Sequence, residues 1–179
     1  MHIIGGKLKG KKLATCKTDS IRPAMALVRK SIFDTLQDFV KDTDVLDLCS
    51  GSGVLGIESL SRGAKELTVI DSEKEAIYLI RKNLEICNLS AKVIHDRLPK
   101  ALRRLKNEKF SLIFLDPPYG NSLFIEETLE KLFANRILKK DGLILIESEL
   151  KSSYKIPEGL TVYKEKRFGN TKVTILCNA

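Results

Sequence analysis

The 179-residue sequence has no tryptophan, two histidines and no apolar run near the roughly 18 residues of a membrane-spanning helix. Its four cysteines stand apart, without a Cys-x-x-Cys pair: Cys16, Cys49, Cys87 and Cys177. We therefore expect no metal site. Isolated cysteines are typical of reduced thiols, and the N-terminal residues 1–6 contain no hydrophobic signal region. These absences predict a cytoplasmic protein that does not span a membrane.

Acidic residues are the minority, with 23 Asp and Glu against 31 Lys and Arg, for a net charge of +8 at pH 7. A basic excess favours a polyanionic partner such as nucleic acid, although it also simply keeps a protein soluble. The length fits one domain, and we see no internal repeat or low-complexity linker. We expect residues 1–40 to form a basic N-terminal hairpin and helix, and residues 41–179 to form the core.

Short apolar segments alternate with helix-period segments from Asp44 onward, which is typical of βαβ units around a parallel sheet. The predicted strands are Val45–Cys49, Glu66–Ile70, Lys92–His95, Phe110–Leu115 and Gly142–Ile146. The predicted helices between them are Val54–Arg62, Glu73–Asn88, Leu98–Leu105 and Leu123–Asn135. Two final strands, Leu160–Tyr163 and Lys172–Cys177, flank a turn at Arg167–Asn170 and favour an antiparallel hairpin. The fold class is α/β.

The N-terminal region combines glycines with basic residues. Residues 2–14 contain Gly5, Gly6 and Gly10, and we expect a short twisted hairpin there. Pro23 suits the first turn of a helix. Apolar or small residues follow at helical spacing: Ala24, Leu27, Val28, Ser31, Ile32, Thr35, Leu36 and Phe39. The candidates for contacts with nucleic-acid phosphates are Lys7, Lys9, Lys11, Lys12, Arg22 and Arg29.

A glycine-rich turn, Asp47 to Gly56, joins the first strand to its helix. Glycines let the backbone approach a ligand closely and turn tightly, and we expect Ser50, Gly51 and Gly53 to contact a cofactor. Such a turn alone also fits a nicotinamide enzyme. However, Asp47 at the strand end would repel a pyrophosphate, whereas it suits the ammonium group of an amino acid.

Acids also end the next two strands. Asp71 follows Gly51 by 20 residues, where a carboxylate can accept from both hydroxyls of a ribose. Asp96 can accept from an adenine amino group, and the neighbours Ser72 and Arg97 complete the predicted cofactor contacts. A strand-end aspartate can instead simply cap the next helix. Acids at three successive strand ends beside a glycine turn nevertheless indicate a crevice for an adenosyl amino acid.

Asp116-Pro117-Pro118-Tyr119 directly follows the predicted strand Phe110–Leu115. The prolines stiffen the loop, the Asp116 carboxylate and the Pro117 carbonyl can accept from an amino group, and Tyr119 can stack on a ring. These groups suit the exocyclic amine of a nucleobase. Catalysis would come from positioning the amine and accepting its hydrogens, without a strong general base. The motif does not distinguish guanine N2 from adenine N6.

On these motifs the chain resembles class I S-adenosylmethionine-dependent methyltransferases, and more closely the bacterial family that methylates guanine N2 in 16S ribosomal RNA. The resemblance also includes Ile3–Leu13, Arg22-Pro23, Val28-Arg29, Leu55–Ala64, Asn83-Leu84 and Phe168–Thr171. It implies a Rossmann-like, mostly parallel seven-stranded twisted sheet with an antiparallel C-terminal strand. It also implies S-adenosylmethionine as methyl donor and 16S rRNA, within an assembling or assembled small ribosomal subunit, as substrate. The chain has Cys49-Ser50, Ala24 and Asp71 where the family usually has Phe-Ala, Thr and Glu.

Three alternatives stay open. An adenine-N6 DNA or RNA methyltransferase would use the same motifs, a non-catalytic RNA-binding module would share the fold, and a nicotinamide oxidoreductase would share the glycine turn. The intact Asp116 to Tyr119 argues against the module. We expect no appended target-recognition domain in a chain of this size, which favours structured RNA over duplex DNA. We expect a monomer whose Arg103, Arg104 and Lys106 extend the phosphate contacts.

Overall fold

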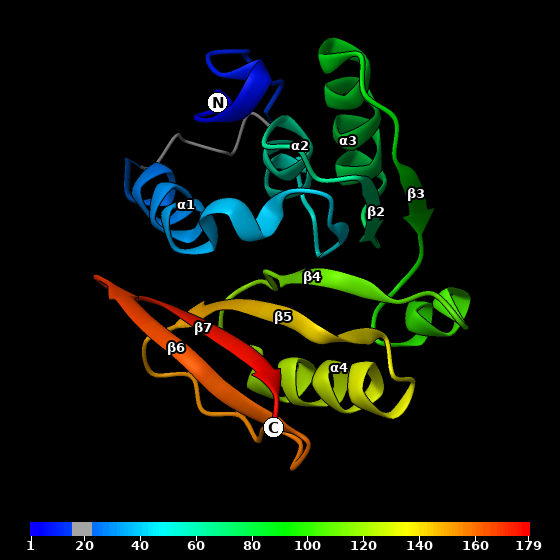
Figure 1. Ribbon diagram of the computed structural model, residues 1–179, viewed down its shortest axis with the longest axis vertical. Helices are drawn as coiled ribbons and strands as arrows, with labels where there is room; N and C mark the ends of the chain where they lie inside the picture. The colour runs from blue at the N-terminus through cyan, green and yellow to red at the C-terminus, as the bar shows by residue number, and fades with distance from the viewer. Residues whose placement is uncertain (16–22) are drawn as a thin grey trace.

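A seven-stranded sheet forms the centre of the computed structural model, which describes residues 1–15 and 23–179 (Figure 1). The strand order is β3-β2-β1-β4-β5-β7-β6. The strands are β1 Asp44–Leu48, β2 Glu66–Asp71, β3 Lys92–His95, β4 Phe110–Leu115, β5 Leu138–Glu149, β6 Leu160–Phe168 and β7 Thr171–Asn178. Strands β1 to β5 run parallel, and β7 pairs antiparallel with β5 and β6. The predicted α/β fold is therefore confirmed.

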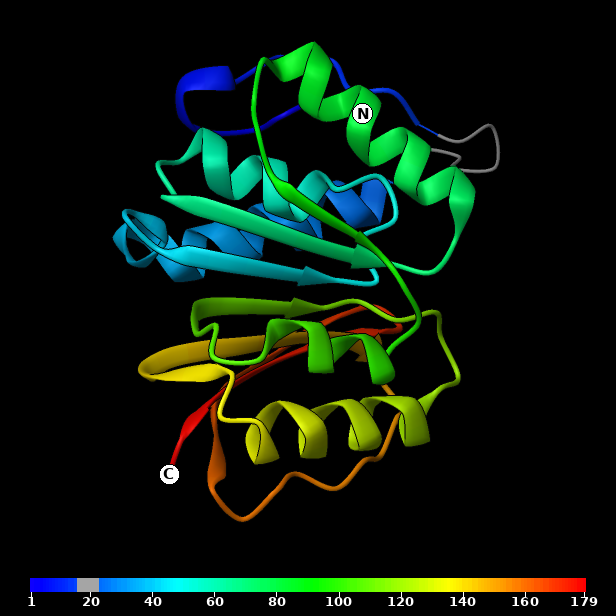
Figure 2. The same ribbon diagram turned by 90° about the vertical axis from the view of Figure 1, so that its right-hand side faces the viewer.

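Helices cover both faces of the sheet (Figure 2). They are α1 Pro23–Leu36, α2 Val54–Ser61, α3 Lys74–Cys87 and α4 Ser122–Ala134, with the 3-10 helices η1 Gly6–Leu8, η2 Gln37–Val40 and η3 Lys100–Leu105. Helices α1, α2 and α3 pack on one face, and η3 and α4 pack on the other. Covering both faces explains the nearly continuous apolar strands: Leu112 and Phe114 face the first layer, and Ile113 and Leu115 face the second.

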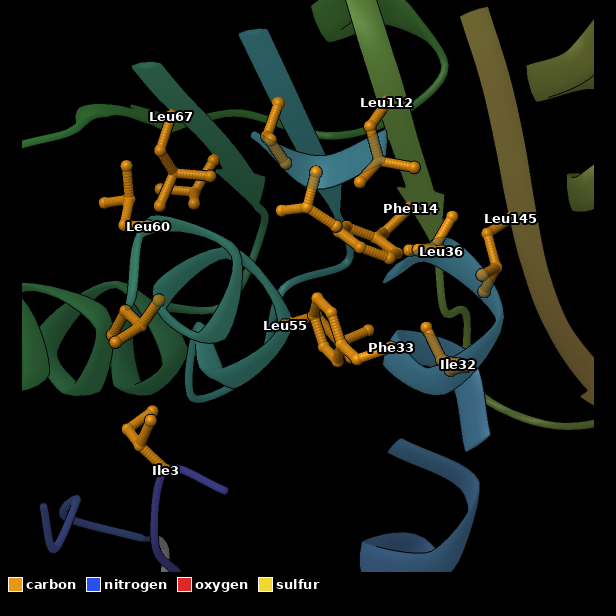
Figure 3. Packing of buried hydrophobic residues seen from close by; sticks show 14 of the residues in the cluster. Ile3, Ile32, Phe33, Leu36, Leu55, Leu60, Leu67, Leu112, Phe114 and Leu145 are labelled. Carbon is orange, nitrogen blue, oxygen red and sulfur yellow. The ribbon is translucent and has the colours of Figure 1, made fainter. Parts of the chain in front are cut away.

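The core of the first layer joins α1 and α2 to the sheet (Figure 3). Phe33 of α1 lies beside Phe114 of β4, with ring centroids 6.0 Å apart. Leu36 and Leu55 lie around these two rings. Phe33 was not part of the predicted apolar stripe of α1, yet it is buried. Leu27, which was part of it, is 63% exposed. The buried face of α1 differs from the prediction because this helix packs against α2 as well as the sheet.

Several element boundaries also differ from the prediction. Strand β5 begins at Leu138, before the predicted Gly142, because Leu138 pairs with Phe110 of β4. Strand β6 extends to Phe168 because it pairs with β7 along this length. The predicted helix Leu98–Leu105 is the shorter η3, and 3-10 helices commonly occur as such short connectors.

The N-terminal segment pairs with itself and is anchored to α2. His2 and Lys12 form an antiparallel bridge, as expected for a hairpin, but the intervening residues include η1 and an isolated bridge replaces the expected strands. The buried carboxylate of Glu58 accepts from the backbone N–H of Ile4 (2.9 Å) and from Nε of Arg62 (2.9 Å). Because an unpaired buried charge would be costly, these contacts hold the segment against α2.

Arg29 lies inside this anchor, which differs from its predicted contact with phosphates. Its side chain belongs to a residue only 6% exposed, donates to the carbonyl of His2 (2.8 Å) and lies 3.9 Å from the Glu58 carboxylate. The guanidinium therefore serves to join α1, α2 and the N-terminal segment. Arg22, predicted for the same role, lies outside the described residues. Within the described ranges, no helix has the length and hydrophobicity needed to cross a membrane.

Candidate active site

A cavity of about 1450 Å³ opens at the carboxyl edge of the sheet. This placement follows from the topology, because the ends of parallel strands meet at one edge. We call the first part of its lining the cofactor half: Cys49, Gly51, Asp71, Ser72, Glu73, Ala76, Asp96, Arg97 and Leu98. We call the second part the acceptor half: Leu27, Val28, Asp116, Pro117, Pro118, Tyr119, Asn121, Phe124, Glu147, Glu149, Leu150, Lys151, Phe168, Gly169, Asn170 and Thr171. The structure thus brings Asp116 to Tyr119 into one cavity with five of the predicted cofactor residues, namely Gly51, Asp71, Ser72, Asp96 and Arg97. The other three, Asp47, Ser50 and Gly53, do not line it.

Asp71 fixes the glycine turn in the cofactor half. Its carboxylate accepts from the backbone N–H groups of Gly51 (2.9 Å) and Glu73 (2.9 Å). Gly51 has a φ of +54°, and a Cβ at this position would meet nothing within 4 Å, so the backbone is open to a ligand. Each carboxylate oxygen keeps a further lone pair. Asp71 can therefore hold the turn and still accept from a ligand hydroxyl, and Ser72 lies beside it on the cavity wall.

Asp96 is held by protein donors as well. Its carboxylate accepts from the backbone N–H of Arg97 (2.8 Å) and from Nε of Arg104 (2.6 Å). These two hydrogen bonds lower the pKa of Asp96 because they stabilise the charged form. Asp96 is thus an ionised, oriented acceptor on the cavity wall. Arg104, expected to contact phosphates, is already paired with it.

Asp47 and Ser50 lie behind the glycine turn, although both were predicted to contact the cofactor. Asp47 is 1% exposed, its Oδ2 accepts from Gly56 N–H (3.0 Å), and its Oδ1 has no hydrogen-bond partner in the described part of the chain. Burial raises the pKa of Asp47 to about 7. Ser50 donates to the Asp47 carbonyl (2.6 Å). The side chains of Asp47 and Ser50 therefore support the turn from the side opposite the cavity. Gly53, also predicted to contact the cofactor, does not line the cavity and precedes α2 with a φ of +75°.

Asp116 lies at the end of β4, where its backbone N–H donates to the carbonyl of Leu48 (3.3 Å). Its carboxyl group lines the cavity beside Glu147 of β5. Burial, followed by the charges of Glu147 and Asp47, raises the pKa of Asp116 well above its ordinary value. Burial also raises the pKa of Glu147. Sequence reasoning missed Glu147, although an acid directly after the apolar run of β5 was an available signal.

Tyr119 connects the Asp-Pro-Pro-Tyr loop to the turn between β6 and β7. Its hydroxyl is hydrogen-bonded to the hydroxyl of Thr171 (2.6 Å), and the residue is 48% exposed. The contact orients the ring while leaving surface for stacking. The sequence motif Phe168 to Thr171 contains this partner, but nothing in the sequence indicated which residue it would meet.

The predicted phosphate contacts of the N-terminal segment lie away from the cavity. Lys7, Lys9, Lys11 and Lys12 are exposed, and none forms an ion pair with another described residue. Leu8 donates its N–H to the hydroxyl of Ser61 (2.9 Å), the last residue of α2. Because α2 begins at the glycine turn and rises about 1.5 Å per residue, its end lies roughly 12 Å from that turn.

No group of three or more His, Cys, Asp or Glu side chains in residues 1–15 and 23–179 is arranged to hold a metal ion. The three described cysteines, Cys49, Cys87 and Cys177, are free thiols, and Cys16 lies outside the described residues.

Known proteins are similar to this chain over nearly its whole length. The family described as Conserved hypothetical protein 95 matches residues 1–177. The chain belongs to this family. A relative named Ribosomal RNA small subunit methyltransferase D, from Buchnera aphidicola subsp. Acyrthosiphon pisum (strain APS), is 34% identical over 167 residues, covering 93% of this chain and 87% of its own. The Escherichia coli (strain K12) protein of that name is 32% identical over 171 residues, covering 94% and 85%.

A solved structure of similar length shows the same fold. It is a putative methyltransferase, yhhF, from Escherichia coli, with a TM-score of 0.86 and 31% identity, covering 99% of this chain and 97% of that one. The family's similarity to this chain therefore extends over the whole described fold, including both halves of the cavity. The resemblance and the Rossmann-like fold predicted from the motifs are confirmed.

Proposed function

We propose that this protein is an S-adenosylmethionine-dependent methyltransferase that acts on an exocyclic amine of 16S ribosomal RNA, guanine N2. One observation carries the proposal: the glycine turn with Asp71 and Asp96 lines the same cavity as Asp116, Pro117 and Tyr119. A methyl donor and an acceptor amine would thus meet in one cavity. The names of the rRNA-modifying relatives support ribosomal RNA as the substrate class.

The charge of the cavity supports the choice of cofactor. Of the described lining residues, six are acidic, namely Asp71, Glu73, Asp96, Asp116, Glu147 and Glu149, and two are basic, namely Arg97 and Lys151. An acidic wall repels the phosphates of a nicotinamide dinucleotide and attracts a ligand that carries sulfonium and ammonium groups. When bound, S-adenosylmethionine supplies a methyl group on a sulfonium centre. The adenosyl part fits the hydroxyl and amino acceptors Asp71 and Asp96.

The acceptor half positions the amine for an in-line displacement. Asp116 and the carbonyl of Pro117 accept its hydrogens, which favours the geometry in which the nitrogen lone pair points toward the methyl carbon. Tyr119 stacks on the extruded base. As the N–C bond forms, the C–S bond breaks, and the amine then loses a proton to Asp116 or to solvent. Pro117 and Pro118 keep the loop stiff, so little reorganisation is required.

The basic excess of the chain supports binding to a polyanion. Lys7, Lys9, Lys11 and Lys12 are exposed and available for phosphates, and they lie away from the reacting groups. This division favours a large structured substrate that reaches both places, such as 16S rRNA in an assembling or assembled small subunit. We propose a monomeric, cytoplasmic enzyme.

The test is methyl transfer from labelled S-adenosylmethionine to small subunits, to free 16S rRNA and to duplex DNA, all from cells lacking this protein. We expect labelled N2-methylguanine in the ribosomal RNA, identified by mass spectrometry of nucleosides and then mapped to one nucleotide. N6-methyladenine would favour the alternative methyltransferase. Undiminished transfer by an Asp116→Ala variant would contradict the proposed chemistry, and the absence of transfer to every RNA would favour a binding module.

A further inference from the structure

The acceptor half contains a second carboxylate, Glu147, that has no part in the displacement described above. Leu115 of β4 pairs with Ile146 of β5 in parallel register. The next residues of the two strands, Asp116 and Glu147, are therefore neighbours at the edge of the sheet, where paired strands lie about 4.8 Å apart. Both residues line the cavity and are partly exposed to it.

Protein donors do not satisfy these two carboxyl groups. In the described ranges, neither side chain has a hydrogen-bond or ion-pair partner, and the charges that act on Asp116 come from two further acids, Glu147 and Asp47. Partly buried acceptors without donors are unfavourable, and burial makes both groups hold a proton more tightly than usual. A ligand that brings two adjacent donors would relieve both.

The two candidate bases differ in this respect. On its Watson–Crick edge, guanine presents the ring N1–H next to the N2 amine, so two neighbouring donors point the same way. Adenine presents the N6 amine next to N1, which is a bare acceptor. Two side-by-side carboxylates, which the two N–H donors of a bound guanine keep ionised, match the first edge and oppose the lone pair of the second. Enzymes that extrude a base read it through this edge.

We propose that Glu147 accepts the N1–H of the target guanine while Asp116 accepts from its N2 amine, and that Glu147 thereby selects guanine over adenine. The assignment rests on the proposed function, and it supplies the discrimination that the Asp-Pro-Pro-Tyr motif lacks. A hydrogen bond to a charged group corresponds to about a 10- to 100-fold preference. Glu147 is in this sense a specificity-determining residue.

The test compares three bases at the mapped nucleotide. Small subunits are reconstituted from 16S rRNA that carries guanosine, 2-aminopurine or adenosine at that position, and kcat/KM is measured with the full-length protein and S-adenosylmethionine. 2-Aminopurine keeps the amine at C2 but has no N1–H. We expect the wild-type protein to prefer guanosine over 2-aminopurine by about 10- to 100-fold. In Glu147→Gln the amide can donate to the bare N1, so this ratio should fall toward one.

The ratio of kcat/KM for guanosine to kcat/KM for 2-aminopurine distinguishes a loss of specificity from damage to the fold. An unchanged ratio in Glu147→Gln overturns the assignment, even when both rates fall, because misfolding or weak cofactor binding lowers both alike. Equal wild-type rates on guanosine and adenosine particles also overturn it, while leaving the methyltransferase activity established. A wild-type protein that methylates none of the particles refutes the proposed function, and the assignment falls with it.

Two controls complete the experiment. Asp141→Asn changes an exposed carboxylate of β5 that lies outside the cavity, and it should leave both rates and their ratio unchanged. Glu147→Gln should melt at the wild-type temperature or above it, because the substitution removes a charge beside Asp116.

Discussion

The carboxyl groups in the two halves of the cavity differ in the hydrogen-bond donors that surround them. In the cofactor half, Asp71 accepts from two backbone N–H groups, and Asp96 accepts from Arg97 and Arg104. In the acceptor half, the described residues offer no donor to the carboxyl groups of Asp116 and Glu147. The first half is therefore ordered before any ligand arrives, whereas the second half is arranged for a ligand that brings its own donors.

The pKa values follow this division. Hydrogen bonds lower the pKa of Asp96, while burial and neighbouring negative charge raise that of Asp116. Both residues follow a parallel strand at the same edge of the sheet. Position in the fold therefore does not determine how tightly a carboxyl group holds its proton, and the local donors and charges do. Substitutions that affect one half at a time test this difference between the two halves.

Asp116→Ala should have the largest effect, because it removes an acceptor from the reacting amine itself. We expect kcat to fall by about 1000-fold or more. The affinity for S-adenosylmethionine should stay within about 3-fold, since the cofactor half is unchanged. Single-turnover methylation measures the first quantity and calorimetry the second. An equally large loss of cofactor affinity would show that the two halves are not independent.

Asp47 should make stability depend on pH, because it is the cofactor-side acid that lacks a full set of donors. Its pKa is about 7 in the folded protein and about 4 in the unfolded chain. The folded state therefore binds the proton more tightly, so this contribution to stability is complete below pH 4 and is lost as pH rises through 7. Asp47→Asn should remove a pH-dependent difference on the order of 4 kcal/mol.

Urea denaturation between pH 4.5 and 8 measures this difference as the free energy of unfolding of the wild type minus that of the variant. The contribution of Glu147 cancels in this difference, and that of Asp116 cancels except for the part due to the charge of Asp47. If the free energy of unfolding depends on pH in the same way in both proteins, the pKa of Asp47 is not raised, and its carboxyl group has a hydrogen-bond donor that the structure does not show.

Asp71→Ala should weaken the cofactor half alone. Losing the carboxylate that holds the N–H groups of Gly51 and Glu73 should raise the Kd for S-adenosylmethionine by about 10- to 100-fold. At saturating cofactor, kcat should stay within about 3-fold of wild type. Glu66→Ala, at the exposed start of the same strand, is the matched control. A large drop in kcat at saturation would mean that Asp71 also positions the reacting groups.

Replacing all four N-terminal lysines by glutamine should affect docking without affecting either half of the cavity. We expect KM for small subunits to rise by about 10-fold and to depend less steeply on salt, with kcat retained. The control carries the same change of charge at Lys65, Lys131, Lys140 and Lys155, which are exposed elsewhere. An equal rise of KM in the control would show that the effect comes from the net charge of the protein and not from the position of these four lysines.

Tyr119→Phe and Thr171→Val should give the smallest effect, about 2- to 5-fold each in kcat/KM, because the ring stays in place when its hydroxyl contact is lost. The double variant should lose no more than either single one, since both remove the same hydrogen bond. Tyr119→Ala, which removes the stacking surface, should cost more. Additive losses would show that the two hydroxyl groups act separately on the substrate.

Much of the architecture could be predicted because it depends on local pattern. Apolar runs marked β1 to β5, the glycines marked the first turn, and acids followed three of the strands. The extra length of β5 at Leu138 could not be predicted, since it depends on pairing with Phe110 of β4. The burial of Arg29 could not be predicted either, because it depends on contacts with His2 and Glu58, which lie in other segments of the chain.

The sequence by itself determined the order of strands and helices, the stiff Asp-Pro-Pro-Tyr loop and the acids available at the edge of the sheet. Periodicity and turn chemistry are properties of neighbouring residues, so they can be seen in the chain alone. Only the tertiary structure decided which acids acquire donors, that Glu147 stands beside Asp116, and that Thr171 holds Tyr119. Strand pairing brings these distant residues together, and burial among such neighbours fixes their proton affinity.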